Sequence, residues 1–190
     1  MSDRALVAQD IPRLPPAGTG LGLVRNTEQL QAARRQHRLE APRSPVSWLL
    51  EQGVIGTQDV ERARPMLRPG EPLEMTLLRR GKIDRDALDL ARAASLSVPF
   101  VDVKRFRRDP KAVATIEASW ARTHEVLPLC FDGPVLVAAC ADPSDVELEQ
   151  ILGFTLNRIV ELVMARPDDL QRAIVAAYGP SEDAPTQRLL

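Results

Sequence analysis

The sequence predicts an α+β protein in which a unit of four helices is followed by a small sandwich with the element order α-β-β-α-β-α. Three observations lead to this fold class. Two helical stretches in the first half nearly repeat each other, and the second half changes to short β-branched runs between helices. The composition, 44% hydrophobic but only 4% aromatic, supplies an aliphatic core.

Composition and charge exclude several classes of protein. The net charge of −1 provides no general attraction to nucleic acid or anionic lipid, so we expect neither as a partner. No apolar run approaches the roughly 20 residues of a membrane span, and the N-terminus lacks the apolar core of a signal peptide, so we expect a cytoplasmic protein. Cys130 and Cys140 flank an expected hairpin, and their positions should not allow a disulfide bond between them. With only two histidines, the chain offers too few ligands for a metal site.

Both ends of the chain are expected to lie outside the folded units. Residues 1–43 form an N-terminal extension that is flexible or partly helical, because prolines and glycines crowd its first part. Within it, "TEQLQAARRQHRL" (residues 27–39) predicts a short helix with Thr27 as its N-cap. Residues 180–190 are polar and are expected to be a disordered tail.

The segment 44–103 is expected to be a helical unit made of two copies. The first copy contains "LLEQGVIGTQDVERAR" (49–64) and the second "LLRRGKIDRDALDLAR" (77–92), in which Leu-Leu, Gly, Ile and Ala-Arg recur at equal offsets. Two copies are too few for a solenoid, so one compact unit of four helices is expected.

Each copy carries the same helix boundaries. A first helix is expected to end at a glycine, Gly53 or Gly81, because glycine readily adopts the left-handed conformation that stops a helix. A second helix is then expected to begin at an N-cap, Thr57 in the first copy and Asp84 in the second.

The segment 104–179 is expected to form the α+β unit, with helices on one face of a small sheet. Asp109, Ser144 and the pair Asp168-Asp169 mark the starts of its helices. The expected elements are a helix over 109–124, antiparallel strands over 125–131 and 134–140, a helix that begins at Ser144 and ends at Gly153, a strand over 158–165 and a final helix over 166–179.

These features together resemble the N-terminal domain of type II secretion and type IV pilus assembly ATPases, also called the general secretion pathway protein E N-terminal or MshEN domain. The resemblance covers residues 45–179. It rests on the tandem LL-x-x-G-x-I repeats, the exit "VPFVDV", the Leu-Pro hairpin, the "ADP" turn and the final helix that ends at Tyr178-Gly179. It implies the α+β fold described above.

The family divides into two functional kinds. Some members bind cyclic di-GMP through tandem copies of a motif resembling RLGxxLxxxGxxxxxxLxxxLxxQ, and others serve as docking modules for a partner at the inner membrane. The same module is also attached to membrane glycosyltransferases. The resemblance implies that the surviving cyclic di-GMP contacts would be Leu49, Gly53, Leu73, Leu77, Gly81 and Leu88.

Both copies depart from the nucleotide motif at its first positions. The Arg-Leu-Gly slot reads Ser44-Pro45-Val46 in the first copy and Pro72-Leu73-Glu74 in the second, so both arginines and both leading glycines are absent. A Cβ at Val46 or Glu74 hinders the close approach of the backbone to a ligand, and Glu74 adds a negative charge beside an anionic nucleotide. We therefore expect the duplication to serve packing, with no cofactor; cyclic di-GMP is the alternative.

A basic segment, "VKRFRRDPK", is the expected partner-binding site, because its charges could hold phosphates or an acidic protein surface; a solvated loop is the alternative. Its candidate residues are Lys104, Arg105, Phe106, Arg107 and Arg108. We expect no catalytic residue, since the chain has no GxxxxGK[ST] loop and no GxSxG elbow.

The hypothesis that we favour is a non-catalytic regulatory or docking domain that binds a protein of a membrane-associated secretion, pilus or polysaccharide machine. The alternative is a cyclic di-GMP receptor with a degenerate motif. A third hypothesis is the regulatory head of an assembly ATPase or a family-2 glycosyltransferase. The sequence identifies neither the partner nor the oligomeric state.

Overall fold

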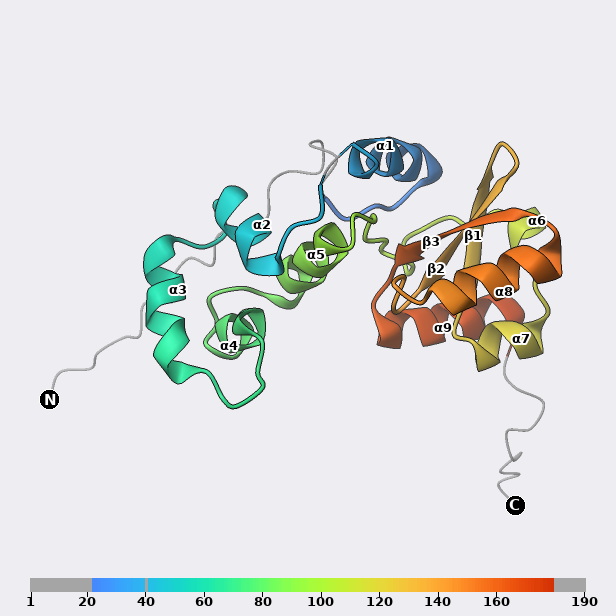
Figure 1. Cartoon of the computed structure of the whole chain (residues 1–190). Coiled ribbons are helices and arrows are strands. Elements are labelled where there is room, and N and C mark those ends of the chain that lie inside the picture. Colours follow the sequence, from blue (N-terminus) through green and yellow to red (C-terminus); the bar gives the residue numbers. More distant parts are fainter. Residues whose placement is uncertain (1–21, 40, 180–190) are drawn as a thin grey trace, which may run out of the picture.

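The computed structural model describes residues 22–39 and 41–179, so the expectations for residues 1–21 and 180–190 lie outside the described part of the chain. Figure 1 shows an elongated arrangement with the helical unit at one end and the sheet at the other. The helices are α1 (Thr27–His37), α2 (Pro45–Glu51), α3 (Thr57–Ala63), α4 (Leu73–Arg79), α5 (Arg85–Ser95), α6 (Pro110–Val113), α7 (Ala118–Thr123), α8 (Val146–Leu156) and α9 (Pro167–Tyr178), with a 3-10 turn at Arg64–Met66. The strands are β1 (Leu127–Asp132), β2 (Val135–Cys140) and β3 (Ile159–Met164).

Helices α2 to α5 form the expected unit of four helices around their own hydrophobic core. Trp48, Leu49 and Leu77 are almost fully buried in it, and Leu88 on α5 joins them. The two copies also contact each other through a salt bridge, because Lys82 Nζ lies 3.2 Å from Asp59 Oδ1 on α3. The predicted α+β class is confirmed.

Some predicted N-caps are confirmed and others are wrong by one residue. Asp84 caps α5 by accepting a hydrogen bond from the Ala87 N–H at 2.7 Å, and Asp109 caps α6. The helices expected to begin at Thr27, Thr57 and Ser144 are capped instead by the preceding or following residue. These caps are Asn26, Gly56 and Asp145.

The segment expected to be one helix over 109–124 is two short helices, α6 and α7. The Thr115 hydroxyl donates to the Ala112 carbonyl at 2.6 Å where α6 ends, and Glu117 is in an extended conformation. The interruption turns Ile116, which is 5% exposed, into the core. Thr115 and Ile116 are β-branched, which lowers the propensity to continue a helix at this point.

The sheet has the order β1-β2-β3, with β1 and β2 antiparallel, as predicted, and β2 and β3 parallel. Five consecutive residues of β2, Leu136 to Cys140, are buried, which requires cover on both faces because alternate side chains point to opposite sides. Cys130 and Cys140 are both free and buried, in agreement with the expectation that they do not pair.

The expectation that helices cover only one face of the sheet is wrong. Figure 1 shows α8 and α9 along one side of the sheet. On the other face lies α1, whose buried Arg34 donates to Asp132 at 2.5 Å and to Glu161 at 2.6 Å. Asp132 and Glu161 lie on the same face because their register partners, Val135 and Val137, are two residues apart on β2.

Candidate interaction surfaces

The glycine turns of the two copies have the same geometry. Gly53 and Gly81 each have φ +67, and in each copy the next residue's N–H donates to a helix carbonyl, Val54 to Leu49 at 3.0 Å and Lys82 to Leu77 at 2.9 Å. A Cβ added at either glycine would meet nothing within 4 Å. Backbone conformation alone therefore explains both glycines.

The leucines of the cyclic di-GMP alternative lie mostly inside the helical unit. Leu49, Leu77 and Leu88 are buried in its core, and Leu73 is half-buried against the same core. The structure does bring these residues together, but as packing residues rather than as an open surface.

The residues that replace the Arg-Leu-Gly of the nucleotide motif lie at the starts of α2 and α4. Ser44 is the N-cap of α2, and its hydroxyl accepts from the Ser47 N–H at 3.1 Å. Pro72 occupies the N-cap of α4. Each slot thus has a structural role at a helix start.

Two arginines, Arg79 and Arg80, directly precede Gly81, and the charge of Arg79 is partly neutralised. Arg79 donates to Glu71 at 3.0 Å and to the Met66 carbonyl at 3.0 Å. The hydrogen bond from Arg79, together with that from Thr76, lowers the pKa of Glu71 to about 2. Arg79 therefore stabilises the loop before α4, which leaves less of its charge for an external anion.

The segment from Lys104 to Arg108 does not present Phe106 to a partner. Phe106, one of the candidate partner-binding residues, is 3% exposed and belongs to the core around the sheet, so its side chain is not available to a partner. Lys104 pairs with Asp169 at 3.1 Å, and Arg108 donates to the Val103 carbonyl at 3.3 Å. Arg107 is exposed.

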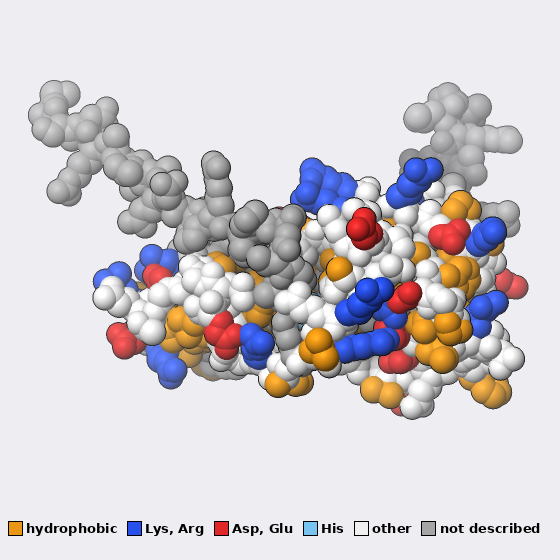
Figure 2. All heavy atoms as spheres, turned by 90° about the horizontal axis from the view of Figure 1, so that it is seen from above, with side chains coloured by type: hydrophobic (Ala, Val, Ile, Leu, Met, Phe, Trp, Pro, Cys, Tyr) orange, Lys and Arg blue, Asp and Glu red, His pale blue; other side chains and the backbone are white. Residues whose placement is uncertain are grey.

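The side chains of this segment line a shallow groove. It has a volume of about 600 Å³ and runs between residues 106–114 and the end of α9. Arg107 and Arg108 lie on one side, and Tyr178, whose hydroxyl donates to the Val113 carbonyl at 2.9 Å, lies on the other. On the face shown in Figure 2, acidic and basic side chains are interspersed and form no single basic field.

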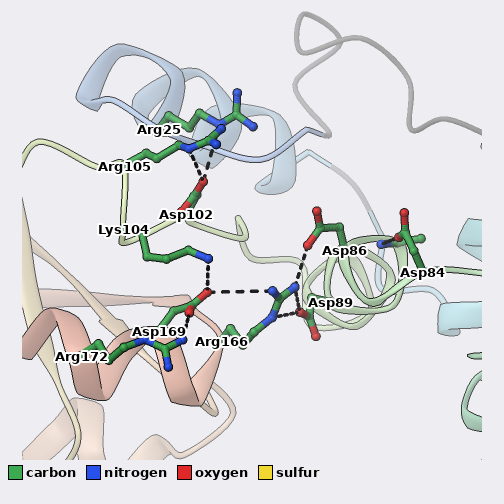
Figure 3. Close-up of polar contacts among 11 residues, drawn as sticks. Arg25, Asp84, Asp86, Asp89, Asp102, Lys104, Arg105, Arg166, Asp169 and Arg172 are labelled. Carbon is green, nitrogen blue, oxygen red and sulfur yellow. Dashed lines mark hydrogen bonds and ion pairs between the residues drawn. The ribbon is translucent and has the colours of Figure 1, made fainter.

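Arg166 joins the helical unit to the α+β unit. Its guanidinium donates to Asp89 and Asp86 of α5, both at 2.7 Å (Figure 3). Burial raises the pKa of Asp89, an effect that the hydrogen bond from Arg166 opposes. Burial opposes the charge of Arg166 as well, but the hydrogen bonds to Asp86 and Asp89 outweigh it and raise its pKa.

Asp169 extends this network on α9. It accepts from Arg172 at 2.5 Å and pairs with Lys104, as Figure 3 shows. Burial opposes its charge, but the hydrogen bonds from Arg172 and Lys104 outweigh that effect and lower its pKa. The network (Lys104, Arg166, Asp169 and Arg172 with Asp86 and Asp89) is therefore a charged link between the two units.

The outward face of α8 was not predicted from the sequence. Leu152 is buried and Leu148 and Leu156 pack beside it on the inner face, whereas Phe154 is 91% exposed. The apolar side chains of the exposed face, which we call the α8 face, are Val146 (60% exposed), Ile151 (46%) and Phe154. The signal in the sequence is an amphipathic stripe of leucines accompanied by a second apolar set on the opposite side.

Among residues 22–39 and 41–179, no group of three or more His, Cys, Asp or Glu side chains is arranged to hold a metal ion. Desolvation raises the pKa of the buried Cys140 thiol to about 12. Cys140 therefore remains a protonated, unreactive packing residue at neutral pH.

The helical repeat, the three-stranded sheet and the helices around it form an α+β fold that matches a solved structure of MshE, described below. Residues 96–184 match the sequence model of the MshEN domain, and the chain is similar in sequence to a type IV pilus assembly ATPase and to MshE. The matched range begins after the repeat and includes the sheet.

Individual relatives agree with this family. The type IV pilus assembly ATPase PilB of Myxococcus xanthus strain DK1622 is 26% identical over 137 residues, which are 70% of this chain and 24% of PilB. The chain thus spans about a quarter of the length of this relative.

Solved structures show the same similarity. A structure of MshE with cyclic di-GMP is 26% identical, with a TM-score of 0.56, and the match covers 73% of this chain and all of the other. The N-terminal domain of XpsE is 21% identical with a TM-score of 0.44, over 74% of this chain and all of the other.

Proposed function

We propose that this chain is a non-catalytic docking and regulatory domain that binds a protein of a secretion, pilus or polysaccharide machine on the cytoplasmic side of the inner membrane. The observation that carries the proposal is the α8 face. Soluble proteins rarely leave several large apolar side chains exposed together, and such patches mark interaction sites. Homology to assembly ATPases supports a partner within a multiprotein machine.

The described residues contain no helix that is both long and apolar enough to cross a membrane.

Co-sedimentation with inner-membrane vesicles from the parent bacterium tests docking. We expect the purified chain to sediment with the vesicles, and to lose this association when the vesicles are first treated with protease. Phe154→Ser should weaken the association about tenfold, because an exposed aromatic anchor contributes much of the binding energy of an interface. The matched control is Val175→Ser, which removes a 48% exposed apolar residue from a different helix, α9.

Two results would contradict docking to a membrane-associated protein. One is the absence of sedimentation, and the other is sedimentation that survives protease treatment of the vesicles. Equal losses in Phe154→Ser and Val175→Ser would show that the α8 face is not the site.

Cyclic di-GMP binding is the second candidate, because MshE was solved with this nucleotide and resembles this chain. The substituted motif slots and the buried leucines weigh against it. Calorimetric titration of the full chain should show no saturable heat. A variant that restores the leading Arg-Leu-Gly of both copies (Ser44→Arg, Pro45→Leu, Val46→Gly, Pro72→Arg and Glu74→Gly) should gain binding if the glycine turns preserve the binding frame. Saturable binding by the unaltered chain would make the repeat a nucleotide sensor.

A further inference from the structure

The α8 face is held rigidly, as a docking surface requires. Asp145 caps the helix by accepting from the Leu148 N–H at 3.0 Å, and Asn157 ends it with φ 48, a left-handed conformation. On the inner side, Leu152 is 1% exposed. When a partner covers Phe154, the backbone of α8 is therefore already ordered and loses little conformational entropy.

The charged side chains around the α8 face are mostly negative. Exposed carboxylates lie at its N-terminal end and along it, whereas Arg158, whose guanidinium lies 5.3 Å above the Phe131 ring, is at its other end. Two of these acids have local roles, because Asp145 is a cap and Asp142 accepts from Ser144. The carboxylates are Asp142, Asp145, Glu147 and Glu149.

Glu147 and Glu149 have no such ionic partner: within the described ranges, no salt bridge involves either of them. Both lie in the first turn of α8, where the positive end of the helix dipole favours their negative charge. Glu147 is seven residues, about two turns, before the exposed Phe154 and therefore lies on the same side of the helix. An occupant of this face therefore meets an apolar centre with an acidic margin.

We propose that the α8 face binds an amphipathic helix of a partner protein whose apolar side is flanked by lysines and arginines. This inference rests on the proposed docking function and names the chemistry of the partner. A helix packed against α8 would cover its 11 residues, about 16 Å at 1.5 Å per residue, with apolar positions spaced three and four apart. Basic flanks would complement Glu147 and Glu149 and accelerate association.

The charges argue against two other occupants. The cytoplasmic leaflet carries negative charge, which repels a surface that bears four carboxylates and one nearby guanidinium. A second copy of the chain would bring the same acidic excess to the contact, so self-association through this face concentrates charge of one sign. A basic protein helix is the occupant that removes both the apolar exposure and the charge excess.

Binding of a labelled synthetic probe tests this chemistry. The probe is an amphipathic helical peptide of leucine and lysine, and its twin has glutamate in place of lysine. By fluorescence anisotropy with the full chain, we expect the lysine peptide to bind at least about tenfold more tightly than the glutamate peptide. Phe154→Ser should lose about tenfold in affinity, whereas Val175→Ser stays within about twofold.

Charge reversal separates specific from general attraction. Glu147→Lys with Glu149→Lys should abolish the preference for the lysine peptide, whereas Glu61→Lys with Glu117→Lys, which makes the same change of net charge at exposed positions outside α8, should preserve it. Equal binding of both peptides, or equal effects of the two charge reversals, would overturn the proposal.

The remaining occupants are separate outcomes. Binding to vesicles of phosphatidylglycerol and phosphatidylethanolamine that Phe154→Ser abolishes would identify a lipid surface and overturn the inference, as would a dimer in sedimentation velocity that the same substitution dissolves. The protease-sensitive sedimentation with native membranes can require Phe154 while the chain binds the lysine and glutamate peptides equally. In that case the docking function stands and the proposal of a basic partner helix is wrong. If that sedimentation is absent, the docking function itself fails.

Discussion

Gly53 and Gly81 occupy equivalent places in the two copies, and the same backbone conformation requires glycine at both. Their φ of +67 disfavours a side chain, although the space around each Cβ position is open. The repeated glycine is therefore a folding signal that needs no ligand to explain it.

Substitution of Gly81 tests this explanation. We expect Gly81→Ala to lower the free energy of unfolding by about 1–2 kcal/mol, because alanine resists the left-handed region. Gly81→Asn should recover about half of that loss, since asparagine tolerates the conformation better. Urea unfolding followed by circular dichroism measures both, and equal losses in the two variants would show that the φ angle is not the cause.

Glu71 provides a pH-dependent prediction at the same scale. Arg79 lowers its pKa in the folded protein from 4.5 to about 2, so its stabilising contribution is present above about pH 4.5 and is lost as the pH falls toward 2. The stability difference between the wild type and Glu71→Gln should therefore be largest near pH 6 and shrink by pH 3. Urea unfolding at both pH values checks this, and a constant difference would contradict the assigned ion pair.

At the scale of elements, α1 shows the limit of local sequence patterns. Its helical boundaries follow from near neighbours, and the structure places the helix close to the predicted range. The stretch "ARRQHR" is basic and its sequence names no partner for its arginines, yet Arg34 is 5% exposed between two carboxylates of the sheet. Its partners are about a hundred residues away in the chain, so no local window contains them.

Removal of this buried guanidinium should loosen α1 from the sheet. We expect Arg34→Met to lower the free energy of unfolding by about 2 kcal/mol, because it removes the buried guanidinium that bridges Asp132 and Glu161 and leaves the exposed Arg38 as the remaining ionic partner of Glu161. The neighbouring Arg35 is exposed, and Arg35→Met should change the stability by less than about 0.5 kcal/mol. Urea unfolding compares them, and similar losses would refute the bridging role of Arg34.

At the scale of the whole molecule, the Arg166 network decides whether the two units behave as one. Arg166 binds two carboxylates of α5 from the start of α9, and Asp89 is 9% exposed beneath it. Breaking a buried ion pair on one side leaves an uncompensated charge, which is more costly than the loss of a surface pair.

Arg166→Met should therefore uncouple the units. The two tryptophans report on them separately, because Trp48 lies in the helical core and Trp120 packs against the core of the sheet. In backgrounds with Trp120→Phe or Trp48→Phe, fluorescence should give coincident urea midpoints when Arg166 is present and separate midpoints in Arg166→Met. Arg107→Met, which removes an exposed arginine, is the control. Coincident midpoints in Arg166→Met would show that other contacts couple the units.

The sequence by itself determined the features that near neighbours control. The period of apolar residues, the glycines Gly53 and Gly81 and the cap Asp84 predicted the elements and the fold class, because helix stops, caps and turns are closed by hydrogen bonds within a few residues. The missing arginines of the nucleotide motif were equally visible in the sequence.

Only the tertiary structure decided which side chains are exposed. Phe106 is buried and Phe154 is 91% exposed, although each is a lone aromatic in a segment that contains charged residues. Likewise, Arg34 and Arg166 became links between distant elements. Burial and ion pairing depend on the residues that folding brings from elsewhere in the chain, and those long-range contacts leave no local pattern in the sequence.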